Sequence, residues 1–324
     1  MSSRCTRWPS TITSPRAGRN WPPISRRAPA AAPEDPTLKI AVLPILDALP
    51  MYAAEAQGYF KEAGINVEFV PVASAAERDQ VMQSGQVDGM INDLTSTVLY
   101  NKDAQKIAVV RFARIASADQ PQFSLLASKA SGITTPDGLK GVEIGISEGT
   151  VIEYITDRLL QNAGLTNDEI KTTNIPQIPV RLQMLAEGQL PAAMLPEPAA
   201  SLAAQGGSVV VISDASLPAV GTSEISFSVS TLKAKPETVR KFLAALEKAT
   251  ADVNNNPDQW NTLLTDKKLV PAPLIGKYQL PKFPTASVPS EAQLKDVQAW
   301  MMDKGLISAE VPYNQLVDAS YLPK

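Results

Sequence analysis

Polar side chains gather in four short stretches of the sequence, and each stretch directly follows an apolar run. The stretches are Leu46–Leu49 with Asp47, Asn92-Asp93 with Thr95, the turn Ser147–Thr150, and Pro196-Glu197. Such groups can hydrogen-bond a small polar ligand, and paired carboxylates can also perform acid–base chemistry. The chain contains no histidine and one cysteine, Cys5. Cys/His zinc sites, Ser–His–Asp triads and Cys–His pairs are thereby excluded. We therefore predict no catalytic residue, no metal ligand and no cofactor.

The stretch around Ser147 shows how such a site would be built. Val142–Ile146 is typical of a buried strand, and Ser147–Thr150 of a tight turn. Thr150–Ala163 has apolar residues at helical spacing on one face and ends before Gly164, which suits a helix C-terminus. A strand, a turn and a helix in this order leave free backbone N–H groups beside the strand end, which favours a small polar ligand. The alternative is an ordinary turn that binds nothing.

The chain repeats this arrangement in two halves. Ser84-Gly85-Gln86-Val87 corresponds to Glu187-Gly188-Gln189-Leu190, and Ala63-Gly64-Ile65 corresponds to Ala163-Gly164-Leu165. We predict an α/β fold with two similar open, mainly parallel sheets flanked by helices. Because ligands of open α/β sheets bind beyond the carboxyl ends of the strands, the four stretches should face one cleft between the halves.

Twelve residues are our candidates for contacting a ligand in that cleft. They are Leu46, Asp47, Asn92, Asp93, Thr95, Ser147, Glu148, Gly149, Thr150, Arg181, Pro196 and Glu197. Several of them have a structural alternative. Asn92 and Asp93 can cap a helix, Glu197 can stabilise a helix dipole, and Arg181 can be a solvated helix residue.

Composition separates the N-terminus from the rest of the chain. Residues 1–33 hold six arginines and no acid, and we expect a disordered basic tail that extends to residue 36. The remainder carries 24 basic and 33 acidic residues, which disfavours binding to nucleic acid or to an anionic membrane. No apolar run is long enough to span a bilayer.

Several segments resemble one family of ABC-transporter substrate-binding proteins. The segments are GYFKEAGINVEFVP, SGQVDGMINDLTS, ISEGTVIEYITDRLL and IPVRLQMLAEGQLPAAMLPEPAA. They are similar to the nitrate/sulfonate/taurine and thiamine-pyrimidine group over about residues 38–320. The resemblance implies a two-lobed, type II periplasmic-binding fold that closes on its ligand by hinge motion. It places lobe I at 37–125 and 226–324 and lobe II at 126–225, with crossings near 123–129 and 223–231.

The resemblance also implies a function. It indicates a monomeric, periplasmic or extracellular solute-binding protein whose partners are an ABC permease and its ATPase. The N-terminus departs from the family, because no apolar export core is visible there. The pyrimidine synthase of thiamine biosynthesis shares the fold and, by family knowledge, uses a histidine and an iron-binding cysteine cluster. We therefore predict that this chain is not an enzyme.

Two questions stay open from the sequence. The alternative function is a cytoplasmic enzyme of the same fold that acts on a small carbonyl or carboxylate metabolite, with Asp47, Asp93, Glu148 and Glu197 as acid–base groups. The ligand is the second question. Helix N-termini favour an anion, but the carboxylates in the same loops repel one. We favour a pyrimidine or an amine, with a sulfonate or related anion as the second choice.

Overall fold

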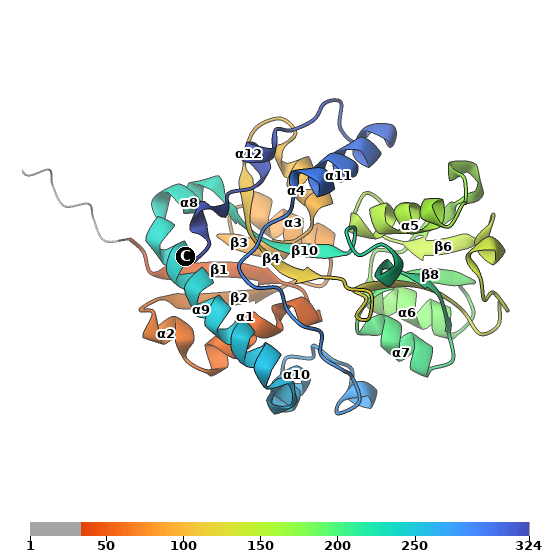
Figure 1. The fold of residues 1–324 in the computed structure, drawn as a ribbon, viewed down its shortest axis with the longest axis horizontal. Coiled ribbons are helices and arrows are strands. Elements are labelled where there is room, and N and C mark those ends of the chain that lie inside the picture. Colours follow the sequence, from red (N-terminus) through yellow and green to blue (C-terminus); the bar gives the residue numbers. More distant parts are fainter. Residues whose placement is uncertain (1–33, 324) are drawn as a thin grey trace, which may run out of the picture. The chain divides into compact units, whose positions relative to one another are not determined.

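Ten strands form two five-stranded sheets in residues 34–323, the part of the chain that the computed structural model describes (Figure 1). The first sheet has the order β2-β1-β3-β10-β4 and the second the order β7-β6-β8-β5-β9. The first contains β1 (Thr37–Val42), β2 (Asn66–Pro71), β3 (Gly89–Asn92), β4 (Ile107–Ile115) and β10 (Thr222–Ser228). The second contains β5 (Phe123–Ala127), β6 (Glu143–Ile146), β7 (Lys171–Asn174), β8 (Ala192–Pro196) and β9 (Val209–Ser213). The expected disordered tail at 1–33 lies outside the described residues.

Both sheets are mixed, whereas we expected mainly parallel ones. In the first sheet β1 pairs in parallel with β2 and β3, but β10 is antiparallel to both of its neighbours. In the second sheet β6 pairs in parallel with β7 and β8, and β5 is antiparallel to both of its neighbours. The reversed strand in each sheet is the one that the chain enters directly from the other sheet. Strand direction is therefore set by the crossings, which the helix-and-strand repeat alone does not reveal.

The crossings lie slightly earlier than expected. β5 belongs to the second sheet from Phe123 onward, and β10 belongs to the first sheet from Thr222 onward. The chain therefore crosses before these strands rather than within them. We use lobe I for the first sheet with its helices and lobe II for the second. Glu34, which we expected in the tail, accepts hydrogen bonds from the backbone N–H groups of Glu237 and Thr238 and so belongs to the folded body.

Helices cover both faces of each sheet (Figure 1). One face of the lobe I sheet packs against α1 (Leu49–Ala56), α2 (Tyr59–Glu62), α8 (Val229–Ala234), α9 (Pro236–Asn255) and α10 (Asn261–Asp266). The other face packs against α3 (Ala75–Gln83) and α4 (Leu94–Asn101). In lobe II, α5 (Val151–Asn162) covers one face, and α6 (Ile178–Ala186) and α7 (Ala199–Gln205) cover the other. α1 and α2 are separate helices because Gly58 between them adopts a left-handed φ of 75°.

The C-terminal helices connect the lobes. α11 (Glu291–Asp303) and α12 (Tyr313–Leu316) pack on α4 of lobe I. α11 also contacts α5 of lobe II, where Trp300 donates a hydrogen bond to Asp157 at 2.8 Å and Arg158 pairs with Asp296 at 3.0 Å. One apolar cluster contains residues of both sheets together with Trp300. Among the described residues, no helix has both the length and the apolar character to cross a membrane.

Candidate functional site

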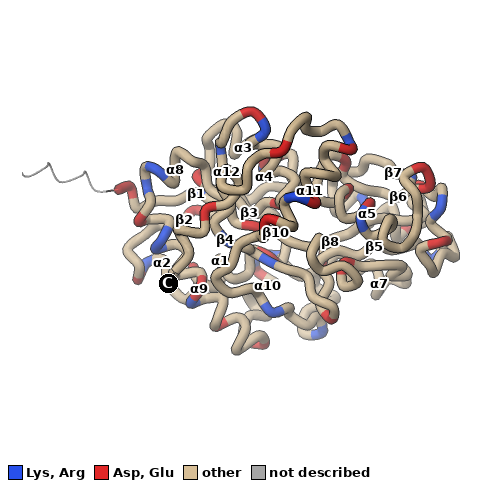
Figure 2. The backbone as a smooth tube through the Cα atoms, turned by 45° about the horizontal axis from the view of Figure 1, so that its top comes forward, with Lys and Arg blue, Asp and Glu red and all other residues tan. Residues whose placement is uncertain are grey.

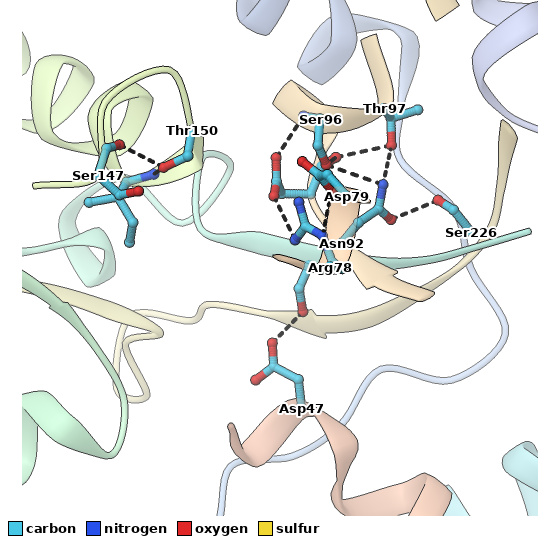
Figure 3. Close-up of polar contacts among 12 residues, drawn as sticks. Asp47, Arg78, Asp79, Asn92, Ser96, Thr97, Ser147, Thr150 and Ser226 are labelled. Atoms are coloured by element: carbon cyan, nitrogen blue, oxygen red, sulfur yellow. Dashed lines mark hydrogen bonds and ion pairs between the residues drawn. The ribbon is translucent and has the colours of Figure 1, made fainter. Parts of the chain in front are cut away.

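A pocket lies between the two lobes at the carboxyl ends of the central strands. Its cavity volume is about 90 Å³, which suits a small molecule rather than a polymer segment. Eight of the twelve candidate residues line it: Asp47, Asn92, Asp93, Ser147, Thr150, Arg181, Pro196 and Glu197. Figure 3 shows Ser147 and Thr150 on one side and Arg78 and Asn92 on the other, with Asp47 below them. As ligand contacts these residues remain predictions, but the structure brings them to one place.

Four candidates lie outside the pocket. Leu46 is fully buried in the lobe I core, and Thr95 is fully buried in the first turn of α4. Gly149 has a φ of 69°, and its N–H donates to the Glu153 carboxylate at 2.7 Å, so that donor is already used. This tight turn carries Ser147 and Thr150 to the pocket and leaves the side chain of Glu148 exposed at the surface. Glu148 is therefore not brought to the pocket with the other candidates, and its contact with a ligand stays a prediction.

Asn92 and Asp93 form a closed hydrogen-bond network at the start of α4. Asn92 Nδ2 donates to Thr97 Oγ1 at 2.8 Å, and Asn92 Oδ1 accepts from Ser226 Oγ at 2.7 Å (Figure 3). Asp93 is the N-cap of α4 and accepts from the Ser96 N–H at 2.8 Å. Their polar atoms are engaged within lobe I. Asp93 has the capping role that we left open, whereas Asn92 bonds other side chains and caps no helix.

Arg78, which the sequence analysis missed, ties this network to the pocket. It lies in α3 and is 3% exposed. Its Nε pairs with Asp79 Oδ1 at 2.8 Å and its Nη1 with Asp93 Oδ2 at 3.2 Å. Its Nη2 is buried and has no hydrogen-bond partner among the described residues. Arg78 lines the pocket and carries an unused donor there.

Asp47 is surrounded by donors that the sequence analysis did not place near it. Its Oδ2 accepts from Gln122 Nε2 at 3.0 Å and from Ser223 Oγ at 2.5 Å. Its Oδ1 lies 3.7 Å from Arg114 Nη1, and Arg114 is 1% exposed. One oxygen of Asp47 is thus hydrogen-bonded within the protein, and the other lies beside a buried arginine. The Oε1 atom of Gln122, in contrast, has no partner in the described part of the chain.

Arg181 lies in α6 of lobe II and is completely buried. Its Nε donates to Met194 O at 2.8 Å and its Nη1 to Ile175 O at 2.6 Å. Nη2 has no partner, and none of the ion pairs among the described residues includes Arg181. Burial lowers the pKa of the Arg181 guanidinium to about 10. Arg181 lies at the pocket, as we expected, but its guanidinium is buried rather than solvated.

Arg78 and Arg181 are equivalent residues of the two lobes. α3 and α6 both have nine residues, and each arginine is the fourth residue of its helix. Each helix is followed by a glycine with positive φ, Gly85 and Gly188, which the sequence analysis already aligned. The repeat in the sequence therefore contained the signal for Arg78. It was missed because we compared the glycine ends of the helices and not their interiors.

Comparison with known proteins now places the chain. The profile of the NMT1/THI5-like family matches residues 46–260. The chain belongs to the NMT1/THI5-like family. A curated relative is the 4-amino-5-hydroxymethyl-2-methylpyrimidine phosphate synthase THI13 of Saccharomyces cerevisiae, which is 26% identical over 226 residues. The alignment spans 64% of this chain and 64% of that relative, a little under two thirds of the relative's length.

Solved structures show the fold. The periplasmic aliphatic sulphonate binding protein SsuA from Escherichia coli has a TM-score of 0.73 at 18% identity and covers 88% of this chain and 98% of its own. The desulfurization enzyme DSZB has a TM-score of 0.67 at 15% identity and covers 88% of this chain and 97% of its own. The predicted periplasmic-binding fold is confirmed.

The same comparisons correct one prediction. We expected this NMT1/THI5-like protein not to be an enzyme. The exclusion is wrong, because the relatives that match at about 26% identity are named synthases and a protein of the same fold is named an enzyme. The lack of histidine and the single cysteine argue against one catalytic chemistry only. Proteins of the same fold can differ in function, so this argument does not exclude other enzymes.

Three buried acids complete the electrostatics of this family member. Burial raises the pKa of Glu224 well above its usual range, Asp93 and Asp47 raise it further, and both of its carboxylate oxygens lack hydrogen-bond partners within residues 34–323. Burial also raises the pKa of Asp214 to about 6. Asp214 accepts hydrogen bonds from the N–H groups of Gln122 and Phe123 at 2.9 and 3.1 Å, where the chain enters lobe II. Burial likewise raises the pKa of Glu197, whose carboxylate accepts from Ser201 Oγ at 2.7 Å.

Proposed function

We propose that this NMT1/THI5-like protein captures a small polar organic molecule between its lobes and delivers it to an ABC import system. The observation that carries the proposal is the pocket itself. Lobe I contributes Asp47 and Arg78 to its lining, lobe II contributes Thr150 and Arg181, and the strand that returns to lobe I contributes Ser223. A ligand that contacts both lobes favours the closed arrangement over an open one, which is how a two-lobed receptor captures its solute.

Further support comes from the likeness to SsuA, which is named a periplasmic binding protein. On this proposal the protein works outside the cytoplasm as a monomer, and its partners are a permease and an ATPase. The pyrimidine or amine favoured from the sequence and the sulfonate ranked second are the first ligand classes to compare.

Two adjacent positions give a sharp test. Ser147 lines the pocket, whereas its neighbour Glu148 is exposed outside it. Screening small metabolites by thermal shift should identify compounds that raise the melting temperature, since a ligand of the folded state stabilises it by mass action. Ser147→Trp should abolish the shift for these compounds, and the matched control Glu148→Trp should retain it. Equal responses of the two variants would place binding outside the pocket.

Closure is a separate measurement. Small-angle scattering with a saturating amount of a compound identified in that screen should show a smaller radius of gyration than the free protein. An unchanged radius would count against capture by hinge motion.

A second candidate function is catalysis in the same pocket, which the relatives named synthases favour. Incubation of the protein with each compound identified in the screen, followed by mass spectrometry, separates the two functions. A receptor returns the compound unchanged, whereas an enzyme yields product in proportion to time and protein concentration.

A further inference from the structure

Arg181 is a buried cation without a counter-ion. It is 0% exposed, and its two bound nitrogens donate only to the uncharged carbonyls of Met194 and Ile175. Burying a charge is costly unless it is paired, and the residues that the structure describes supply no acidic partner for it. Arg181 lines the interlobe pocket and has a free Nη2 donor. Charge compensation of Arg181 therefore favours an anionic group in the pocket.

Arg78 presents a second free donor from the opposite lobe. Its Nη2 has no partner in residues 34–323, although Asp79 and Asp93 pair with its other two nitrogens. The equivalence of α3 and α6 makes the two arginines a repeated pair, one on each lobe and both in the pocket lining. Guanidinium groups bind carboxylate and phosphate oxygens through directed N–H bonds, so two of them suit one oxyanion group.

Gln122 calls for a hydrogen-bond donor on the ligand, whereas the two arginines call for an acceptor. Its Nε2 faces the Asp47 carboxylate, which can only accept, and this orients the amide. The Oε1 atom is therefore an acceptor, and it is buried and has no partner within the described part of the chain. Gln122 also lines the pocket. A ligand that satisfies it must carry an N–H or O–H donor.

We propose that the ligand is a small organic anion whose sulfonate, carboxylate or phosphate group lies between Arg181 and Arg78 and whose N–H or O–H donor binds Gln122 Oε1. The inference rests on the proposed capture function and specifies the chemical class of the solute. It reverses the preference for an amine, because the carboxylates on which that preference rested are occupied. Asp47 and Asp93 lie against Arg114 and Arg78, Glu197 accepts hydrogen bonds from Ser201, and Glu148 lies outside the pocket.

Small probes that share one scaffold test both requirements. Taurine, β-alanine and O-phosphoethanolamine each join an amine to one anionic group, ethanolamine lacks the anion, and ethanesulfonate lacks the amine donor. Calorimetric titration at low ionic strength should show that at least one of the three bifunctional anions binds at least 100-fold more tightly than ethanolamine. Ethanesulfonate should bind at least threefold more weakly than taurine. Binding of ethanolamine that equals or exceeds that of all three anions would overturn the proposal.

Two variants assign the effect to the arginines. Arg181→Met should weaken binding of the preferred anion at least tenfold, and Arg78→Lys, which keeps a cation beside Asp79 and Asp93, should weaken it several-fold. Melting curves of the free variants establish that they fold. An unchanged affinity in folded Arg181→Met would refute the role of this residue.

Lobe I itself suggests a gain-of-charge test with a matched control. Arg78 is followed by its partner Asp79, whereas Arg181 is followed by Leu182. Leu182→Asp supplies Arg181 with an internal counter-ion and should weaken the preferred anion at least tenfold, while Leu182→Asn should have a much smaller effect. Equal effects of the two substitutions would contradict the charge argument.

Failure of this inference is distinguishable from failure of the capture function. Closure around a neutral or cationic compound from the metabolite screen, with normal affinity in Arg181→Met, would leave capture intact and refute the anion. If no screened compound shifted the melting temperature and none of the three bifunctional anions bound, both proposals would fall.

Discussion

Helices α3 and α6 carry the same arginine in two different electrostatic settings. In lobe I, Arg78 is held by two carboxylates, Asp79 and Asp93. In lobe II the residue after Arg181 is Leu182, and Glu197, which follows strand β8 as Asp93 follows β3, accepts from Ser201 instead. Among the described residues, Arg181 therefore has only backbone carbonyls as partners. Figure 2 shows acidic and basic residues interspersed along the described chain. The repeat has kept the cation in both lobes and kept its internal neutralisation in only one.

The difference matters because a buried ion pair and a lone buried ion respond oppositely to mutation. Removing one partner of a pair leaves an uncompensated charge, whereas removing a lone charge also removes its desolvation penalty. We infer that lobe I is organised before any ligand arrives, while the arrangement in lobe II becomes favourable only when an external group approaches Arg181.

The largest expected effect tests this contrast directly. Arg78→Met leaves the buried Asp93 and the half-buried Asp79 without their partner and should lower the free energy of unfolding by about 3–5 kcal/mol. Arg181→Met loses two hydrogen bonds but removes a lone buried charge, so its change should stay below about 2 kcal/mol. Urea denaturation of the ligand-free proteins measures both. Similar losses of unfolding free energy in the two variants would contradict the proposed difference between Arg78 and Arg181.

Glu224 gives the second test, through pH. Its folded-state pKa is raised by burial and by Asp93 and Asp47, so the folded protein binds this proton more tightly than the unfolded chain. The stabilisation that it contributes is complete below its unfolded pKa and is lost as pH rises through the folded value. Glu224→Gln cannot ionise, so its stability relative to the parent, measured between about pH 5 and pH 9, should be greater at high pH than at low pH. A stability difference that is flat across this range would show that Glu224 is not the titrating group.

Much of the fold could be predicted from the sequence because local signals agreed with the final structure. Gly85, Gly164 and Gly188 all have positive φ just beyond a helix, which is the conformation that marked them in the sequence. The pocket also lies where strand ends predict it. The positions of the reversed strands β5 and β10 could not be predicted in this way, since strand direction depends on long-range pairing rather than on local pattern.

The sequence could not show which charged groups pair with each other in the folded protein. Asp47 and Asp93 were correctly placed at the pocket, yet their partners Arg114 and Arg78 come from segments that appeared unrelated to it. Charge balance in a site depends on such distant partners. Counting the carboxylates in four loops therefore pointed to an amine, and adding the buried arginines points to an anion.

Glu197 and Glu148 give a smaller test within lobe II. Glu197 is buried, and its carboxylate accepts from the backbone N–H and the hydroxyl of Ser201, whereas Glu148 is exposed. Glu197→Gln keeps one acceptor and should change the free energy of unfolding by about 1 kcal/mol. Glu148→Gln should change it by less than about 0.5 kcal/mol and leave affinity for any bound compound unaltered. Thermal melts and titrations of the two variants decide this, and a loss of affinity in Glu148→Gln would indicate that Glu148 contacts the ligand.

The smallest expected effect concerns the contact between the lobes themselves. Lys304, which follows α11, pairs with Glu153 at 2.9 Å and with Asp157 at 2.8 Å, and both acids lie on α5 of lobe II. Its side chain is 38% exposed, so solvent and salt screen these pairs, and Asp157 keeps its hydrogen bond from Trp300 when the lysine is removed. Lys304→Met should therefore cost only about 0.5–1 kcal/mol, and the difference from the parent should shrink at high ionic strength. Chemical denaturation in urea at low and at high salt measures this difference. A loss of stability as large as that of Arg78→Met, or one that salt leaves unchanged, would contradict this expectation. It would mean that the Lys304 ion pairs behave like the buried ion pairs of Arg78.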